Sequence, residues 1–180
     1  SECSDNLTYH LSYNYFNNVD SEFVTLNANQ LSGNITDFQI GTNYIKWTVT
    51  DACGNSSSCT SKVFVEDRVR PNAVCDRTTT TAITGNGRAV VEAITFDDGS
   101  VDNCGILKYE VRKMTDSCGF GTTNYTPTVE FCCAEVNTTV MVELRVTDIH
   151  GNSNSCMVEV IVQDKLPPYI TKCPKDITLD

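Results

Sequence analysis

The sequence has little of what most enzymes and nucleic-acid-binding proteins require. It contains two histidines, and its 13 lysines and arginines stand against 23 acidic residues. Because the basic residues are dispersed, no basic stripe can neutralise phosphates, and nucleic acid is not an expected partner. Gly-rich phosphate loops and the His-Glu-x-x-His motif are missing too. His10 and His150 lie about one domain apart, and His150 sits in an expected hairpin tip. We therefore expect no active site.

Long apolar runs are also missing. No stretch approaches the ~20 apolar residues that a helix needs to cross a bilayer, so membrane insertion is not expected. No signal peptide is visible, and no stretch shows a convincing helical period. Because the cysteines described next imply export, we expect the sequence to be a mature chain or a window from a longer one.

Cysteine is abundant, with ten residues and no Cys-x-x-Cys pair among them. Zinc sites show tight paired spacings, which this chain lacks. Scattered cysteines in a Thr/Ser/Asn-rich chain indicate disulfides formed in an oxidising compartment. The sequence therefore predicts an extracellular or cell-surface protein.

An internal repeat sets the expected architecture. Val49-Thr50-Asp51 followed by Gly54-Asn55-Ser56 recurs as Val146-Thr147-Asp148 followed by Gly151-Asn152-Ser153, an offset of 146 − 49 = 97. The same offset relates Cys59 to Cys156 and Pro71 to Pro168, and 98 relates Cys75 to Cys173. A period of about one hundred residues is the size of one immunoglobulin-type sandwich. We predict part of one repeat over residues 1–66, a complete repeat over 67–164, and the start of a third over 165–180.

Alternation with a period of two marks the expected strands. Val140, Val142, Leu144 and Val146 share one face, while Glu143, Arg145 and Thr147 share the other. The same spacing occurs in Ile45-x-Trp47-x-Val49, Val63-x-Val65 and Val158-x-Val160-x-Val162. Asp and Gly-Asn between such runs are typical of hairpin turns. The predicted fold class is all-β, with tandem immunoglobulin-like sandwiches stapled by disulfides.

The turn strings and the motifs after them form a specific combination: Gly41 to Asn55 with Cys59-Thr60, Val65-Glu66-Asp67 through Pro71 to Cys75, and Asp164 through Pro167-Pro168 to Cys173-Pro174. Together they resemble the hyalin repeat (HYR). Asp98 to Gly105 resembles the variant in giant surface proteins of gliding Bacteroidetes. The resemblance implies tandem sandwiches, cell-surface adhesion or filament building, and export by the type IX pathway. The middle repeat departs from the pattern, since His150 replaces the turn cysteine and Cys118, Cys132 and Cys133 are extra.

The cysteines suggest a pairing scheme. Cys75 opens the complete repeat and Cys156 lies in its last strand, so we pair them, and we pair Cys3 with Cys53. By the same rule Cys59 needs a partner before residue 1 and Cys173 one after residue 180. Because a vicinal bridge is strained, two arrangements remain for the other four. We prefer Cys104–Cys133 with Cys118–Cys132; the alternative is Cys104–Cys132 with Cys118–Cys133.

One acidic stretch is a candidate metal site. Asp97, Asp98, Ser100 and Asp102 supply several oxygens within seven residues around Gly99, and Ca²⁺ takes six to eight oxygen ligands. The spacing is not that of an EF-hand. The alternative is an acidic turn in which Asp and Ser side chains bind backbone amides.

These observations favour a structural function. We expect a stalk, fibre or surface appendage for cell attachment, with neighbouring repeats as partners, a possible bundle of several copies, and an unidentified surface or cell as target. A calcium-dependent, lectin-like binding domain and an accessory domain of a secreted hydrolase are the alternatives.

Overall fold

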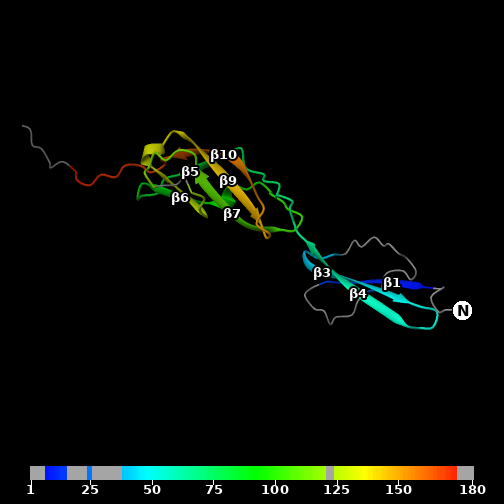
Figure 1. The fold of residues 1–180 in the computed structure, drawn as a ribbon. Helices are drawn as coiled ribbons and strands as arrows, with labels where there is room; N and C mark the ends of the chain where they lie inside the picture. The colour runs from blue at the N-terminus through cyan, green and yellow to red at the C-terminus, as the bar shows by residue number, and fades with distance from the viewer. Residues whose placement is uncertain (1–6, 16–23, 26–37, 121–123, 174–180) are drawn as a thin grey trace, which may run out of the picture. The chain divides into compact units, whose positions relative to one another are not determined.

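The computed structural model describes residues 7–15, 24–25, 38–120 and 124–173 of the chain. The chain divides into two compact units, Ser1–Asp67 and Arg68–Asp180. We call these unit 1 and unit 2 (Figure 1). No helix in the described part of the chain is long and apolar enough to cross a membrane.

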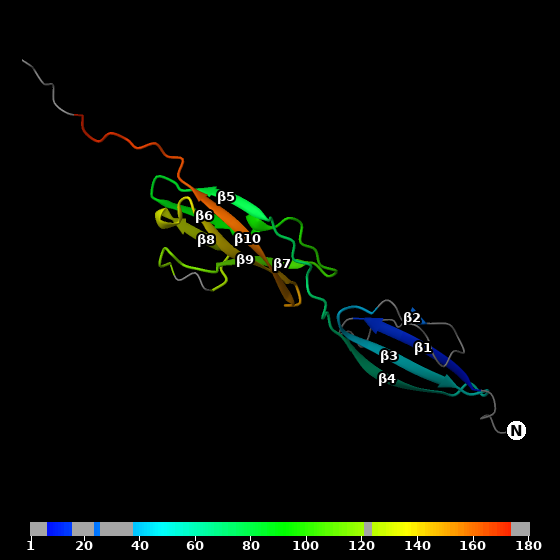
Figure 2. The ribbon, with the colours of Figure 1, turned by 90° about the horizontal axis from the view of Figure 1, so that it is seen from above.

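Unit 1 is built on one antiparallel sheet. Its strands are β1 (Thr8–Tyr15), β2 (Val24–Thr25), β3 (Gly41–Thr50) and β4 (Ser56–Val65). They lie in the order β2-β1-β3-β4, so that β4 is at one edge (Figure 2). Leu11 on β1 stands opposite Trp47 on β3 and is 3% exposed.

Unit 2 has two sheets. The larger has the order β5-β10-β9-β7 and the smaller pairs β6 with β8. The strands are β5 (Thr78–Ala82), β6 (Arg88–Glu92), β7 (Ile106–Lys113), β8 (Thr128–Cys132), β9 (Thr139–Asp148) and β10 (Ser153–Gln163). Two short 3₁₀ helices follow β6 and β8: η2 (Ala93–Phe96) and η3 (Cys133–Glu135).

The core of unit 2 lies between these sheets. Its larger sheet contributes alternate residues, all at most 5% exposed: Val140, Val142, Leu144, Val146, Val158, Val160 and Val162. Ala89, Val129 and Phe131 face them from the smaller sheet, and Phe96 joins from η2. The inward faces that the sequence predicts for β9 and β10 are confirmed. In a half-exposed strand every second side chain points into the core, and in these two strands the side chains at those positions are apolar.

The strand connections identify the fold of unit 2. Along the chain, the first, third, fifth and sixth strands of the unit join the larger sheet, and the second and fourth join the smaller. The first strand, β5, runs parallel to the last, β10, and the other pairs are antiparallel. This distribution of strands between two packed sheets is that of an immunoglobulin-like sandwich. The prediction of an all-β, disulfide-stapled fold is confirmed.

Candidate functional site: cysteine bridges and acidic turns

One disulfide closes unit 2. Cys75 lies three residues before β5, and Cys156 lies within β10. Their Cα atoms are 6.0 Å apart across a sequence separation of 81 residues. The bond therefore ties the segment that enters the sandwich to the strand that leaves it, which is the pairing that the sequence predicts.

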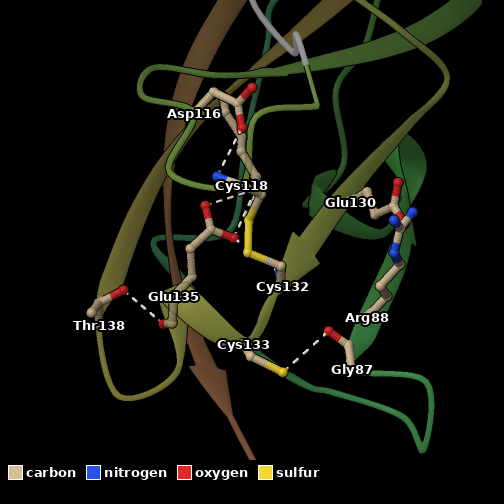
Figure 3. Close-up of a disulfide and its surroundings, with 10 residues drawn as sticks. Gly87, Arg88, Asp116, Cys118, Glu130, Cys132, Cys133, Glu135 and Thr138 are labelled. Carbon is tan, nitrogen blue, oxygen red and sulfur yellow. Dashed lines mark hydrogen bonds and ion pairs between the residues drawn. A yellow bond between two sulfur atoms is a disulfide. The ribbon is translucent and has the colours of Figure 1, made fainter.

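A second disulfide joins Cys118 to Cys132, 14 residues apart in the chain (Figure 3). Beside it lies the ion pair between Lys113 and Glu135, each residue 2% exposed. Lys113 Nζ donates to both carboxylate oxygens of Glu135, at 2.8 and 2.7 Å, and lies 4.7 Å from the centre of the Phe131 ring. Because isolated charges are costly to bury, each of these two side chains needs the other.

Glu135 also organises the backbone around the disulfide. Its Oε2 accepts a hydrogen bond from the backbone N–H of Cys132 at 3.2 Å, and its carbonyl accepts one from the Thr138 hydroxyl at 2.7 Å. Sequence analysis missed this pair. Lys113 stands two residues after Val111 on β7, so alternation alone places it on the inner face.

The preferred bridge between Cys104 and Cys133 is absent from the structure, where both residues keep their thiols. Cys104 lies beside His150, in the turn after β9, with its sulfur within 4.8 Å of an imidazole nitrogen. Cys133 lies before the start of β9, with its sulfur 3.5 Å from the carbonyl oxygen of Gly87 (Figure 3). A ten-residue strand spans roughly 30 Å, so the two thiols belong to opposite ends of the sandwich.

Four further cysteines belong to the predicted pairings. Cys53 is disulfide-bonded, and Cys3, its predicted partner, lies outside the described residues. Cys59 and Cys173 are exposed thiols. The partners predicted for them beyond both ends of the sequence stay predictions.

The two repeated turns have the same hydrogen bonds. Asp148 Oδ1 accepts from the backbone N–H groups of His150 and Asn152, both at 2.8 Å, and its Oδ2 accepts from the Asn152 amide. Asp51 binds Cys53 and Asn55 in the same way. Hydrogen bonds from the side chain and backbone of Asn55 hold the pKa of Asp51 below its usual value. The Asp and Asn side chains thus build each turn from within.

The predicted calcium residues occupy separate local turns. Asp97 accepts hydrogen bonds from the backbone N–H groups of Gly99 and Ser100. The hydroxyl of Ser100 donates to the carbonyl of Val74 and accepts from its N–H, which joins the loop to the segment before Cys75. Asp98 donates its own backbone N–H to the Val74 carbonyl.

Asp102 differs from the other three. Its Oδ2 accepts from the backbone N–H groups of Cys104 and Gly105, at 2.8 and 3.2 Å. Its Oδ1 is buried without a hydrogen-bond partner, and carboxylate oxygens of Asp102 and the fully buried Asp148 approach within 4.8 Å. The structure therefore brings Asp102 toward Asp148 rather than toward Asp97.

A shallow hollow in unit 2 is lined by Glu92, Ala93, Ile94, Tyr109, Pro127 and Thr128. Burial, together with the neighbouring Asp97 carboxylate, raises the pKa of the Tyr109 phenol.

Comparisons with known proteins add little to this picture. No protein-family model matches the chain, and none of the curated proteins does. Among solved structures, the chain is similar to the N-terminal four immunoglobulin domains of Dscam1 isoform 1.9, with 16% identity and a TM-score of 0.39. The match covers 88% of this chain and 37% of that one, so the chain spans little more than a third of that structure. The immunoglobulin-like assignment rests on the strand order of unit 2.

Proposed function

We propose that this chain is an extracellular structural and adhesive repeat module, part of a stalk, fibre or surface appendage that carries tension. The Cys75–Cys156 bond is the observation that supports this most directly. Force that enters unit 2 from its N-terminal side reaches Cys75, crosses the disulfide to Cys156, and leaves along the last residues of β10. The residues between the two cysteines are thereby removed from the load path.

The pairing of β5 with β10 suits the same purpose. The two strands are parallel over five residue pairs, from Thr78 opposite Glu159 to Ala82 opposite Gln163. When the disulfide is reduced, tension passes through the start of β5 and the end of β10, and it therefore shears the two strands along their length. All hydrogen bonds between them then resist together. The hyalin-repeat resemblance, with attachment at a cell surface and type IX export, fits such a module and belongs to this proposal.

Single-molecule extension of the chain, held at its two ends, tests this function. Without reductant we expect no unfolding step from the loop that the Cys75–Cys156 bond closes, whose ends are 81 residues apart in the sequence. With a thiol reductant, unit 2 should release about 280 Å of additional length, at ~3.5 Å per residue.

Two variants sharpen the extension experiment. Without reductant, Cys75→Ser/Cys156→Ser should release this length less about 50 Å, because the intact Cys118–Cys132 bridge holds back 14 residues at ~3.5 Å each. Cys118→Ser/Cys132→Ser should release none of it, because its bridge lies inside the loop that the first one closes. Equal extension with and without reductant would contradict a load-bearing role. Antibody labelling of unit 2 on intact producing cells tests the surface location.

Calcium-dependent ligand binding is the second candidate, and the buried Oδ1 of Asp102 near Asp148 favours it. Two carboxylates at this distance repel unless a cation or proton lies between them. If calcium binds there, CaCl₂ should raise the unfolding temperature relative to EDTA, and Asp102→Asn should abolish the rise. Asp98→Asn distinguishes a site at Asp102 and Asp148 from a site formed by the whole 97–102 loop. The substitution should weaken calcium binding only at the second of these. An unfolding temperature that ignores calcium would remove this candidate.

A further inference from the structure

A thiol and an imidazole meet at one end of unit 2, in two loops that are far apart in the sequence. The sulfur of Cys104 and a ring nitrogen of His150 lie within 4.8 Å of each other. Cys104 is half-buried and His150 is exposed, so an ion from the solvent can reach both side chains. Cysteine thiolate and histidine imidazole are both common ligands of Zn²⁺ in proteins.

The backbone at each of these two residues is held by an aspartate two positions earlier. Asp102 Oδ2 accepts a hydrogen bond from the N–H of Cys104 at 2.8 Å. Asp148 Oδ1 accepts one from the N–H of His150, also at 2.8 Å. Both side chains therefore start from fixed turns, and binding an ion does not have to order either loop. Such preorganisation removes part of the entropic cost of binding.

Backbone contacts also hold the two loops against each other. The N–H of Ile149 donates to the carbonyl of Gly105 at 3.1 Å, and Ile106 stands opposite Asp148 in the register of β7 and β9. Ligands at ordinary zinc distances in a tetrahedral site bring sulfur and nitrogen to about 3.6 Å from each other. Rotation of the exposed imidazole is enough to reach this separation from the observed one.

The internal repeat gives the same position a different chemistry in unit 1. The offset of 97 residues relates His150 to Cys53, and Cys53 is disulfide-bonded. The turn of unit 1 is therefore tied at this position by a covalent bond. A histidine cannot form such a bond, and Cys104 beside it keeps its thiol. An ion that binds both side chains would give unit 2 an equivalent tie.

The types of ligand decide which cation suits this pair. Ca²⁺ and Mg²⁺ prefer oxygen ligands, whereas thiolate and imidazole together favour zinc or copper. The carboxylates of Asp102 and Asp148, which approach each other within 4.8 Å, add negative charge to the same loops. This charge favours a divalent cation over a monovalent one.

We propose that Cys104 and His150 form a Zn²⁺ site that ties the 102–105 loop to the turn after β9. The Cys104 thiol gives its proton to the buffer when the sulfur binds the ion as thiolate. Water fills the remaining positions of the tetrahedral ion. The site lies within unit 2, and it depends neither on the adhesive function proposed above nor on calcium.

Titration of the chain with Co²⁺ in oxygen-free buffer tests the site, because thiolate-bound cobalt absorbs in the near ultraviolet by charge transfer. We expect this band to appear and then to disappear when Zn²⁺, which binds such ligands more tightly, displaces the cobalt. Cys104→Ser should abolish the band, and His150→Asn should weaken cobalt binding at least about tenfold.

Two matched controls remove the same residue types elsewhere. Cys133→Ser removes an exposed thiol at the other end of unit 2, and His10→Asn removes the histidine of unit 1. Both should leave the cobalt band and its midpoint unchanged. A chain without the band, a band that survives Cys104→Ser, or cobalt binding that ignores His150→Asn would overturn the proposal.

His150→Cys tests the geometry without a metal. Because the two side chains face each other, oxidation of this variant should form a disulfide between positions 104 and 150, detected by peptide mapping. The cobalt band should be lost at the same time, since no thiolate remains there. Two thiols that stay separate under oxidation would show that the positions do not approach closely enough for a shared ion, and would refute the site.

Discussion

The buried Lys113–Glu135 ion pair makes the stability of unit 2 depend on paired charges as well as on apolar packing. Both side chains are 2% exposed or less, and they lie beside the Cys118–Cys132 bridge. Removing one charge leaves the other buried without a counterion, which is more damaging than losing the pair as a whole.

We predict that Glu135→Gln lowers the free energy of unfolding of unit 2 by about 3–5 kcal/mol, measured by urea denaturation. Lys113→Met/Glu135→Leu should recover most of this loss, because no unpaired charge remains. Arg88→Ala is the control. It breaks the Arg88–Glu130 ion pair, whose side chains are 51% and 28% exposed, and should cost less than about 1 kcal/mol. A double variant as unstable as Glu135→Gln would contradict the buried-charge explanation.

At the scale of elements, β7 and β9 are joined on their outer face by charged side chains. Arg145 binds Glu110 and Arg112 binds Glu143, each at 2.6 Å, and both arginines stack on Tyr125, at 3.8 and 4.7 Å from its ring centre. Glu110 stands opposite Arg145 and Arg112 opposite Glu143 in the strand register. The segment that carries Tyr125 is thus fastened to the sheet by the same residues that join the strands.

This network predicts an acid-sensitive contribution to stability. Burial raises the pKa of Glu143, but hydrogen bonds from Ser155, Arg112 and Tyr125 outweigh it, and the pKa is lowered. The pKa of Glu110 is lowered against burial by Arg145 and Lys108. A carboxyl group whose pKa falls on folding stabilises the fold above its unfolded pKa, and this contribution is lost as the pH falls through the folded value.

We therefore expect Glu143→Gln to lower the unfolding temperature at pH 7. The difference from the unchanged chain should shrink as the pH falls below the pKa of an unfolded Glu, about 4.3. Calorimetric scans between pH 7 and pH 3 measure this. Glu159→Gln, at an exposed position of β10, is the control for loss of charge alone. A difference that grows toward low pH would have the wrong sign.

Strands and turns were predictable because each leaves a local pattern. Alternation fixed the inner faces of β9 and β10, and the Asp-x-x-Gly-Asn strings located both hairpin turns. Pairing among the cysteines was predictable only where the repeat set their positions, as for Cys75 and Cys156. Nothing local says that Cys104 and Cys133 lie at opposite ends of a ten-residue strand, or that the Asp148 carboxylate of β9 lies close to Asp102. Such neighbours depend on long-range packing.

For the whole molecule, the two described bridges of unit 2 should contribute unequally. Their loops span 81 and 14 residues. Loop-closure entropy then predicts a loss of about 4.5 kcal/mol for Cys75→Ser/Cys156→Ser and about 3 kcal/mol for Cys118→Ser/Cys132→Ser. Guanidinium denaturation of each double variant measures this difference. Equal losses would show that native-state contacts, rather than loop length, determine what each bridge contributes.

The parallel pairing of β5 with β10 also fixes an order of events during biosynthesis. Thr78 pairs with Glu159, so the first strand of unit 2 must wait for about eighty later residues before its neighbour exists. At ~5–20 residues per second this wait lasts roughly 4 to 16 seconds. Such non-local pairing folds slowly. During this delay the sheet of unit 2 is incomplete and the Cys75–Cys156 bond cannot form. An export pathway that transports unfolded chains could therefore act on the unit before it folds, and folding would then finish outside the cell.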